Sequence, residues 1–147
     1  MLRPLCQGLC LAMLAMLLAG CGGPDDPLHS LNAAADSLQR ALDEKQTSEV
    51  MALLHPEFGT DQGMDAQWAR RTMTGLFLRH RTVSVVVLKR EAELAPGALD
   101  AARVEALVVL VGAERLVPDA ARQYRVRSEW RRDGADGDWK LFRLGWE

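Results

Sequence analysis

Apolar residues recur at helical spacing between residues 28 and 42. Successive members are three or four residues apart, so they form one stripe along a helix: Leu28, Leu31, Ala35, Leu38 and Leu42. A second, shorter helix is predicted to begin at Thr47 or Ser48, either of which can cap it, and to stop before Pro56. The pattern therefore predicts two consecutive helices in this part of the chain.

A third helix is predicted from Asp65, whose carboxylate can cap the first turn, to about His80. Its apolar side is formed by Trp68, Ala69, Met73, Leu76 and Phe77. Beyond His80 the period of the apolar residues changes from helical to extended.

The second half of the chain predicts strands. Residues 82–94 and 104–116 contain runs of β-branched and aliphatic residues. Apolar and polar residues alternate over 124–131, which predicts one buried and one solvated face. The turn-rich segment 133–137 then leads into a last strand over 139–147, one face of which carries Phe142, Leu144 and Trp146. Helices followed by antiparallel strands indicate the α+β class.

A different pattern fills the first 20 residues. Arg3 gives them a weakly positive start, and residues 5–18 are apolar apart from Gln7 and Gly8. That length suits the hydrophobic region of a signal peptide and is short for a span across a bilayer. We therefore expect residues 1–20 to be a signal peptide.

The four residues Leu18, Ala19, Gly20 and Cys21 resemble the lipobox of bacterial lipoproteins at every position. The resemblance implies cleavage between Gly20 and Cys21, a diacylglycerol thioether on Cys21 and a further acyl chain, such as palmitate, on the new N-terminus. Several chains would hold the protein on a membrane, since one chain gives only marginal binding. An ordinary cleaved signal peptide or a short membrane helix is the alternative.

Residues 21–27 are expected to be a lipidated tether ahead of one domain over 28–147. Glycines and prolines in this segment favour a flexible, non-helical linker. In the lipoprotein family an aspartate directly after the cysteine retains the protein at the inner membrane, and Gly22 occupies that position here. The resemblance therefore implies the periplasmic face of the outer membrane.

The charge, cysteines and histidines of the chain argue against several kinds of function. The formal net charge of −2 gives no electrostatic reason to expect nucleic-acid binding. Cys6 and Cys10 lie in the leader, so Cys21 would be the only thiol left after cleavage, and no internal disulfide is expected. The histidines do not stand at metal-ligand spacing, and neither a metal nor another cofactor is predicted.

The order of three helices and then long strands that end in a hairpin resembles the NTF2-like superfamily, with its SnoaL-like branch and cystatin-like α+β fold. Residues 50–58 look like the second-helix segment of that superfamily, and residues 131–134 with 138–141 look like its closing hairpin. The resemblance implies a strongly curved, mostly antiparallel sheet that wraps the helices as a cone with an internal cavity. Isomerases, dehydratases, hydrolases and binding modules share this fold, so the site has to decide the function.

Three side chains could serve as a general acid or base in such a cone: Asp65, His55 and His80. Each also has a simpler role. Asp65 stands where a helix cap is wanted, His55 stands at a helix end, and His80 stands at a helix C-terminus, where a positive charge suits the dipole. No catalytic residue is therefore assigned.

A set of mostly aromatic residues could line an apolar pocket: Trp68, Phe77, Tyr124, Ser128, Trp130, Phe142 and Trp146. The same side chains would also fill a core, which is the simpler interpretation. Arg125, Arg127 and Arg131 form a cationic stripe suited to a partner or to anionic headgroups, although the intervening Glu129 favours an ordinary solvated face.

These observations lead to the expectation of a non-catalytic NTF2-like lipoprotein of the cell envelope that binds a small apolar ligand or a protein partner. The alternative is a SnoaL-like isomerase or hydrolase that acts on a hydrophobic small molecule. A third expectation, implied by the resemblance, is a homodimer formed through the sheet.

Overall fold

Helices come first and most of the sheet follows, as the pattern predicts. The structure is a computed structural model that describes residues 26–112 and 122–147. Its helices are α2 (Pro27–Asp43), α3 (Thr47–Leu53) and α4 (Ala66–Arg79). Its strands are β1 (Leu54–Thr60), β2 (Val83–Leu94), β3 (Ala101–Gly112), β4 (Arg122–Arg131) and β5 (Lys140–Trp146). The predicted α+β class is confirmed.

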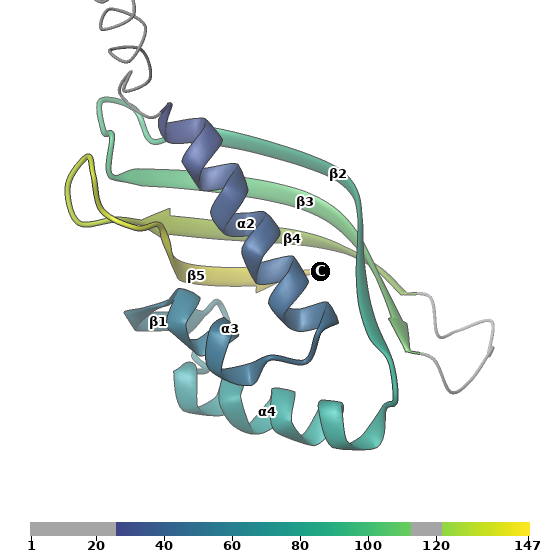
Figure 1. Ribbon diagram of the computed structural model, residues 1–147. Coiled ribbons are helices and arrows are strands. Elements are labelled where there is room, and N and C mark those ends of the chain that lie inside the picture. The colour runs from purple at the N-terminus through teal and green to yellow at the C-terminus, as the bar shows by residue number, and fades with distance from the viewer. Residues whose placement is uncertain (1–25, 113–121) are drawn as a thin grey trace, which may run out of the picture.

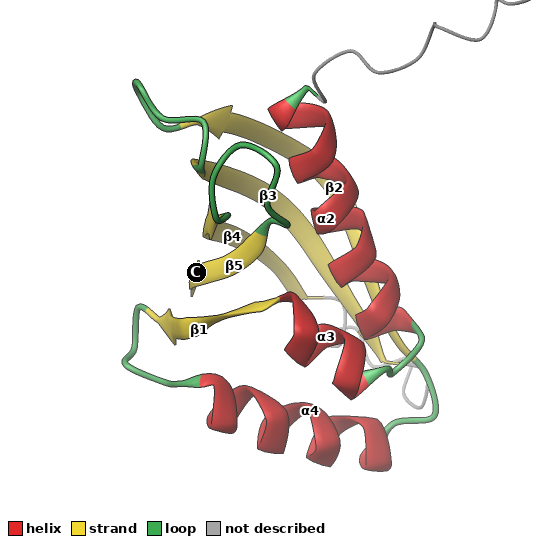
Figure 2. Ribbon diagram, turned by 60° about the vertical axis from the view of Figure 1, so that its left-hand side comes forward, coloured by secondary structure: helices red, strands yellow, loops and turns green. Residues whose placement is uncertain are grey.

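The five strands form one sheet in the order β1-β5-β4-β3-β2. Neighbouring strands are antiparallel except β1 and β5, which are parallel. The sheet bends so that its concave side faces the three helices (Figure 1, Figure 2). Curvature of this kind leaves space between the sheet and the helices that side chains fill only in part.

Side-chain caps define where two helices begin. The Asp26 carboxylate accepts a hydrogen bond from the backbone N–H of Leu28, and Pro27 takes the first helical position, where its missing N–H costs nothing. Pro27, assigned to the tether from the sequence, is therefore the first residue of α2. The Asp65 carboxylate caps α4 by accepting from the N–H of Trp68 at 2.8 Å.

The second helix is shorter than predicted, because the chain changes from helix to strand at Leu54. The sequence pattern did not predict this strand, β1. α3 stops at Leu53, and the chain continues as a strand through His55 and Pro56. β1 is an edge strand whose pairing with β5 is irregular between Leu54 and Gly59. Pro56 lies in this interval, where its missing N–H breaks no regular ladder.

The strand predicted over 104–116 corresponds to β3, which ends at Gly112, and its last residues lie outside the described part of the chain. The core packs α2 against the sheet around Leu31, Trp130 and Leu141, and a smaller cluster joins α2, α3 and α4 through Ala41, Val50 and Met73. Over the described ranges, no helix combines the length and hydrophobicity needed to cross a membrane.

Candidate functional site

A cavity of about 470 Å³ lies between the concave face of the sheet and the helices, and we call it the cone cavity. Alternate residues of the strands point into it because strand side chains alternate between faces. β2 and β3 contribute Val85, Val87, Val104, Ala106, Val108 and Leu110. Leu76 and Leu110 line it and keep 42% of their surface exposed, which indicates an opening between α4 and the end of β3.

The polar groups deepest in the wall are already paired. The buried Ser128 hydroxyl donates to the carbonyl of Val104 at 3.2 Å and accepts from the indole N–H of Trp130 at 3.0 Å. Tyr124 and Thr72 also line the cavity, and neither hydroxyl has a hydrogen-bond partner among the described residues. These two hydroxyls could bind a polar atom of a ligand.

Among the described residues, the charged side chain that lines the cone cavity is Arg90, which lies where α2 meets β2. Arg90 donates from Nη1 to the Asp36 carboxylate at 2.5 Å and from Nη2 to the Gln39 side-chain oxygen at 3.4 Å. Gln39 in turn donates to the carbonyl of Val85 at 2.8 Å. This network attaches α2 to the sheet, so Arg90 has a structural role without a ligand.

The three candidate acid–base residues lie away from this wall. Asp65 caps α4, and His80 ends α4, where its carbonyl accepts from Nζ of Lys45. His55 lies on β1, its Nδ1 accepts from the N–H of Glu57 at 3.1 Å, and its ring meets that of Phe142 edge-on. Within the described ranges, no Asp, Glu or His lines the cone cavity.

Five of the seven predicted lining residues face the cone cavity: Trp68, Tyr124, Ser128, Trp130 and Trp146. Phe77 instead packs against the smaller core cluster of α2, α3 and α4. Phe142 is also outside the cavity wall, because the β4–β5 register shifts between Glu129 and Trp130 and leaves it as an extra residue. Its ring lies beneath the guanidinium of Arg131, 3.5 Å from the centroid.

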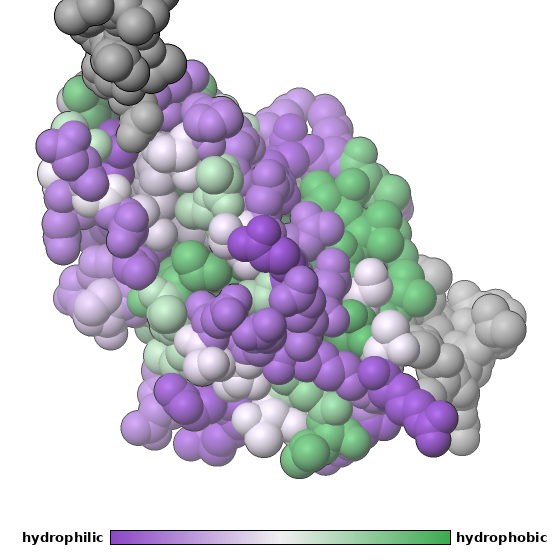
Figure 3. Space-filling view, viewed as in Figure 1, coloured by the Kyte–Doolittle hydropathy of each residue, from purple (hydrophilic) through white to green (hydrophobic). Residues whose placement is uncertain are grey.

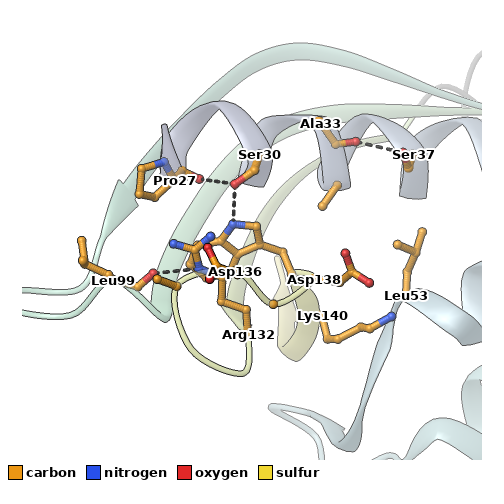
Figure 4. A pocket seen from close by; sticks show the side chains of 14 residues that line it. Pro27, Ser30, Ala33, Ser37, Leu53, Leu99, Arg132, Asp136, Asp138 and Lys140 are labelled. Carbon is orange, nitrogen blue, oxygen red and sulfur yellow. Dashed lines mark hydrogen bonds between the residues drawn. The ribbon is translucent and has the colours of Figure 1, made fainter. Parts of the chain in front are cut away.

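A second hollow of about 670 Å³ lies between α2 and the loop that joins β4 to β5, and we call it the hairpin groove. Its helical side consists of small side chains, including Ser30, Ala33 and Ser37 (Figure 4). Trp139 forms part of the wall and is 3% exposed, and its indole N–H donates to the Ser30 hydroxyl at 3.0 Å. The Ser30 hydroxyl donates a hydrogen bond to the carbonyl of Pro27 at 3.1 Å.

Four charged residues line the hairpin groove: Arg132, Asp136, Asp138 and Lys140. Arg132 stacks on the Trp139 ring with its guanidinium carbon 4.7 Å from the centroid, and its Nε donates to the carbonyl of Leu99 at 2.9 Å. Lys140 donates from Nζ to the carbonyl of Ala52 at 2.7 Å. In Figure 4, Arg132 lies toward the Leu99 end of the groove and Lys140 toward the Leu53 end.

Clear pKa shifts fall elsewhere, on an exposed pair of β2. The 2.6 Å hydrogen-bonded ion pair raises the pKa of Lys89 and lowers that of Glu91. In the part of the chain that the structure describes, no group of three His, Cys, Asp or Glu side chains is placed to hold a metal ion.

Solved structures share this architecture at low sequence identity. Bd1075 of Bdellovibrio bacteriovorus matches with a TM-score of 0.67 and 12% identity over 81% of this chain, which spans 40% of that protein. A putative dehydratase from the NTF2-like family of Streptomyces avermitilis matches with a TM-score of 0.65 and 13% identity, over 84% of this chain and 97% of that one. The chain has an NTF2-like fold. A putative ketosteroid isomerase from Shewanella frigidimarina matches with a TM-score of 0.63 and 12% identity, over 85% and 98% of the two chains.

No family model and no curated protein sequence matches the chain. The sequence identified part of the wall of the cone cavity, namely five of its aromatic and polar residues. The aliphatic residues of β2 and β3 were predicted to lie in strands, but the sequence did not indicate that they line a cavity. The hairpin groove was missed altogether, and the one available signal was a concentration of charge around Trp139, from Arg132 to Lys140.

Proposed function

We propose that the protein is a lipid-anchored lipoprotein of the cell envelope whose cone cavity binds a small, mainly apolar molecule without changing it chemically. The observation that supports this proposal is an apolar cavity of about 470 Å³ whose described wall contains no carboxylate and no histidine. Ligand sites in proteins span roughly 300–1,000 Å³ and are lined mostly by apolar side chains. The volume is about three times that of the ~150 Å³ cavity that takes up benzene.

Two neighbouring valines of β3 provide a matched test. Val108 lines the cone cavity, whereas Val109 points to the opposite face of the sheet. We expect Val108→Phe to narrow the cavity and to reduce the bound ligand about tenfold, while Val109→Phe leaves it unchanged. The measurement is native mass spectrometry of the domain recovered from a bacterial periplasm.

The domain is suitable for this experiment because every residue of its two core clusters lies within 28–147. An ordinary signal peptide would replace residues 1–21, so that no lipid interferes with the mass. An adduct that survives in both valine variants, or no adduct on the unaltered domain, would contradict binding in the cone cavity.

The second candidate is an isomerase or hydrolase acting on a hydrophobic small molecule. The names of two similar structures, a putative dehydratase and a putative ketosteroid isomerase, favour it. Acid–base catalysis needs a proton-transferring group within hydrogen-bond reach of the substrate, and the described cavity wall offers neither carboxylate nor imidazole for that role. We therefore expect the extracted ligand to keep both its mass and its chromatographic retention time after incubation with fresh protein. A changed mass would favour a hydrolase, and a new retention time at unchanged mass would favour an isomerase.

The anchor is tested on the full-length chain. Cells fed radioactive palmitate should label the protein, and Cys21→Ser should abolish the label because the thioether can no longer form. The altered precursor should also keep residues 1–20, which gel mobility would report. Equal labelling of the two proteins would refute the anchor.

A further inference from the structure

Arg132 is a largely buried arginine whose charge is not paired with a carboxylate of the described residues. The residue is 8% exposed, yet no carboxylate of the described residues lies within the 4.0 Å limit of an ion pair with it. Its Nε donates to the carbonyl of Leu99, and the terminal nitrogens have no hydrogen-bond partner in the same set. These nitrogens keep contact with solvent, because no buried side-chain nitrogen or oxygen of the described residues is without a partner. An anion that comes from solvent can therefore reach them.

The missing partner can enter from the hairpin groove, since Arg132 lines it. A guanidinium fork binds the oxygens of a phosphate or a carboxylate through parallel hydrogen bonds. The Trp139 ring and the Leu99 carbonyl fix the guanidinium in place, so little side-chain entropy is lost when an anion binds.

The same groove holds two exposed carboxylates that oppose a purely anionic ligand. Asp136 and Asp138 line it, and neither forms an ion pair with another described residue. In Figure 4, the Asp138 carboxylate lies between Arg132 and Lys140. A ligand that carries an anion and a cation a short distance apart would match both kinds of group.

We propose that the hairpin groove binds a phosphate–ammonium zwitterion of the phosphoethanolamine type. The phosphate lies against Arg132, and the ammonium lies against Asp136 and Asp138. This inference uses a different site from the proposed ligand of the cone cavity, because the two hollows share no lining residue.

Both a phospholipid headgroup and a free phosphodiester carry this chemistry. The groove begins at Pro27, six residues after Cys21, and six extended residues reach about 20 Å. If the anchor at Cys21 holds, the groove is within reach of the headgroups of the membrane that receives the lipid. The lipid source therefore rests on the proposed anchor, whereas the zwitterion site does not.

The test titrates the domain over 22–147 with glycerophosphoethanolamine and, separately, with glycerol phosphate, by isothermal calorimetry. The first compound should bind at least about tenfold more tightly than the second, since only it has an ammonium. Asp136→Asn with Asp138→Asn should remove that preference without touching the Arg132 contacts. Glu129→Gln, an exposed change on β4, is the control that should keep it.

Equal affinity for the two compounds, no heat with either, or an unchanged preference in the double variant would overturn the zwitterion site. Arg132→Gln should abolish binding of both compounds, and circular dichroism would report whether that variant still folds. Co-sedimentation with phosphatidylcholine vesicles, with and without phosphatidylethanolamine, then identifies the source. Phosphatidylethanolamine-dependent sedimentation supports the lipid headgroup, and its absence beside binding of the free compound overturns the lipid source.

Discussion

At the scale of single residues, Ser128 connects two strands and an indole through one hydroxyl. The hydroxyl donates to β3 at Val104 and accepts from Trp130 on its own strand, and both side chains are buried. Removing it would leave the indole N–H of the buried Trp130 without its hydrogen-bond partner. An unsatisfied buried donor costs more than a hydrogen bond gains.

Ser128→Ala should lower the free energy of unfolding by about 1–3 kcal/mol in urea denaturation. Thr74→Ala removes an exposed hydroxyl from α4 and should change it by less than about 0.5 kcal/mol. With Trp130→Phe as background, the loss caused by Ser128→Ala should shrink, because the indole donor is already gone. An undiminished loss would show that the contact does not stabilise the protein.

The sequence predicted which face of β4 a residue lies on, but it did not predict every residue's burial or contacts. The alternation over 124–131 placed Tyr124, Ser128 and Trp130 on one face, and all three line the cone cavity. Phe142 departed from its predicted face, because a shift of register between β4 and β5 cannot be read from the alternation of one strand. Charged side chains such as Arg132 gave no pattern that distinguishes a buried position from an exposed one.

At the scale of elements, α4 was predictable because its start, its stripe and its end agree. Asp65 caps it, its apolar residues recur at helical spacing, and the chain leaves the helix at His80. β1 was not predictable in this way. Its seven residues contain Pro56 and Gly59, and among the described strands it pairs with β5, more than 80 residues later.

Gly75 in α4 and Gly137 in the β4–β5 loop differ in the space available for a side chain. A Cβ added at Gly75 in α4 meets nothing within 4 Å, whereas one at Gly137 in the β4–β5 loop would lie 2.4 Å from the backbone oxygen of Asp133. Gly75→Ala should stabilise the protein by about 1 kcal/mol, because alanine loses less backbone entropy in a helix. Gly137→Ala should destabilise it by about 1–3 kcal/mol, because the loop has to move.

The two variants are compared with the unaltered protein by their unfolding midpoints in guanidinium chloride. The midpoint should rise for Gly75→Ala and fall for Gly137→Ala. A shift of both midpoints in the same direction would contradict the local geometry of one of the two elements.

At the scale of the whole molecule, apolar residues gather on the outer face of the sheet. Val86, Leu88 and Val111 are 42%, 54% and 43% exposed, and the neighbouring Val85, Val87 and Leu110 face the cone cavity. Figure 3 shows this apolar surface along the bent half of β2. Contiguous apolar surface of this kind is typical of an interface with another protein.

We predict that a second copy of the chain covers this surface. Sedimentation velocity of the domain should show a dimer whose fraction rises with concentration, and Leu88→Asp should shift it toward the monomer. Leu78→Asp places the same charge on the outer side of α4, at a leucine that is 84% exposed, and should leave the dimer intact. A monomer at every concentration, or equal effects of the two aspartates, would argue against this interface.

The overall architecture was the most predictable level, because helices and strands follow one another in blocks and the fold class depends on that order. The hairpin groove was the least predictable. It joins the first turns of α2 to a loop about 100 residues later, and nothing in either segment alone indicates the other.

The contact between α2 and β2 protects an edge of the sheet from pairing with a neighbouring molecule. β2 is an edge strand, and at Val85 its N–H donates to the Asp43 carboxylate while its carbonyl accepts from Gln39. An edge strand with free backbone groups invites strand addition by a neighbour. If the proposed anchor holds the protein on a membrane, copies meet far more often than in dilute solution. At Val85, near the start of β2, side chains of α2 already use the backbone groups with which a neighbour would extend the sheet.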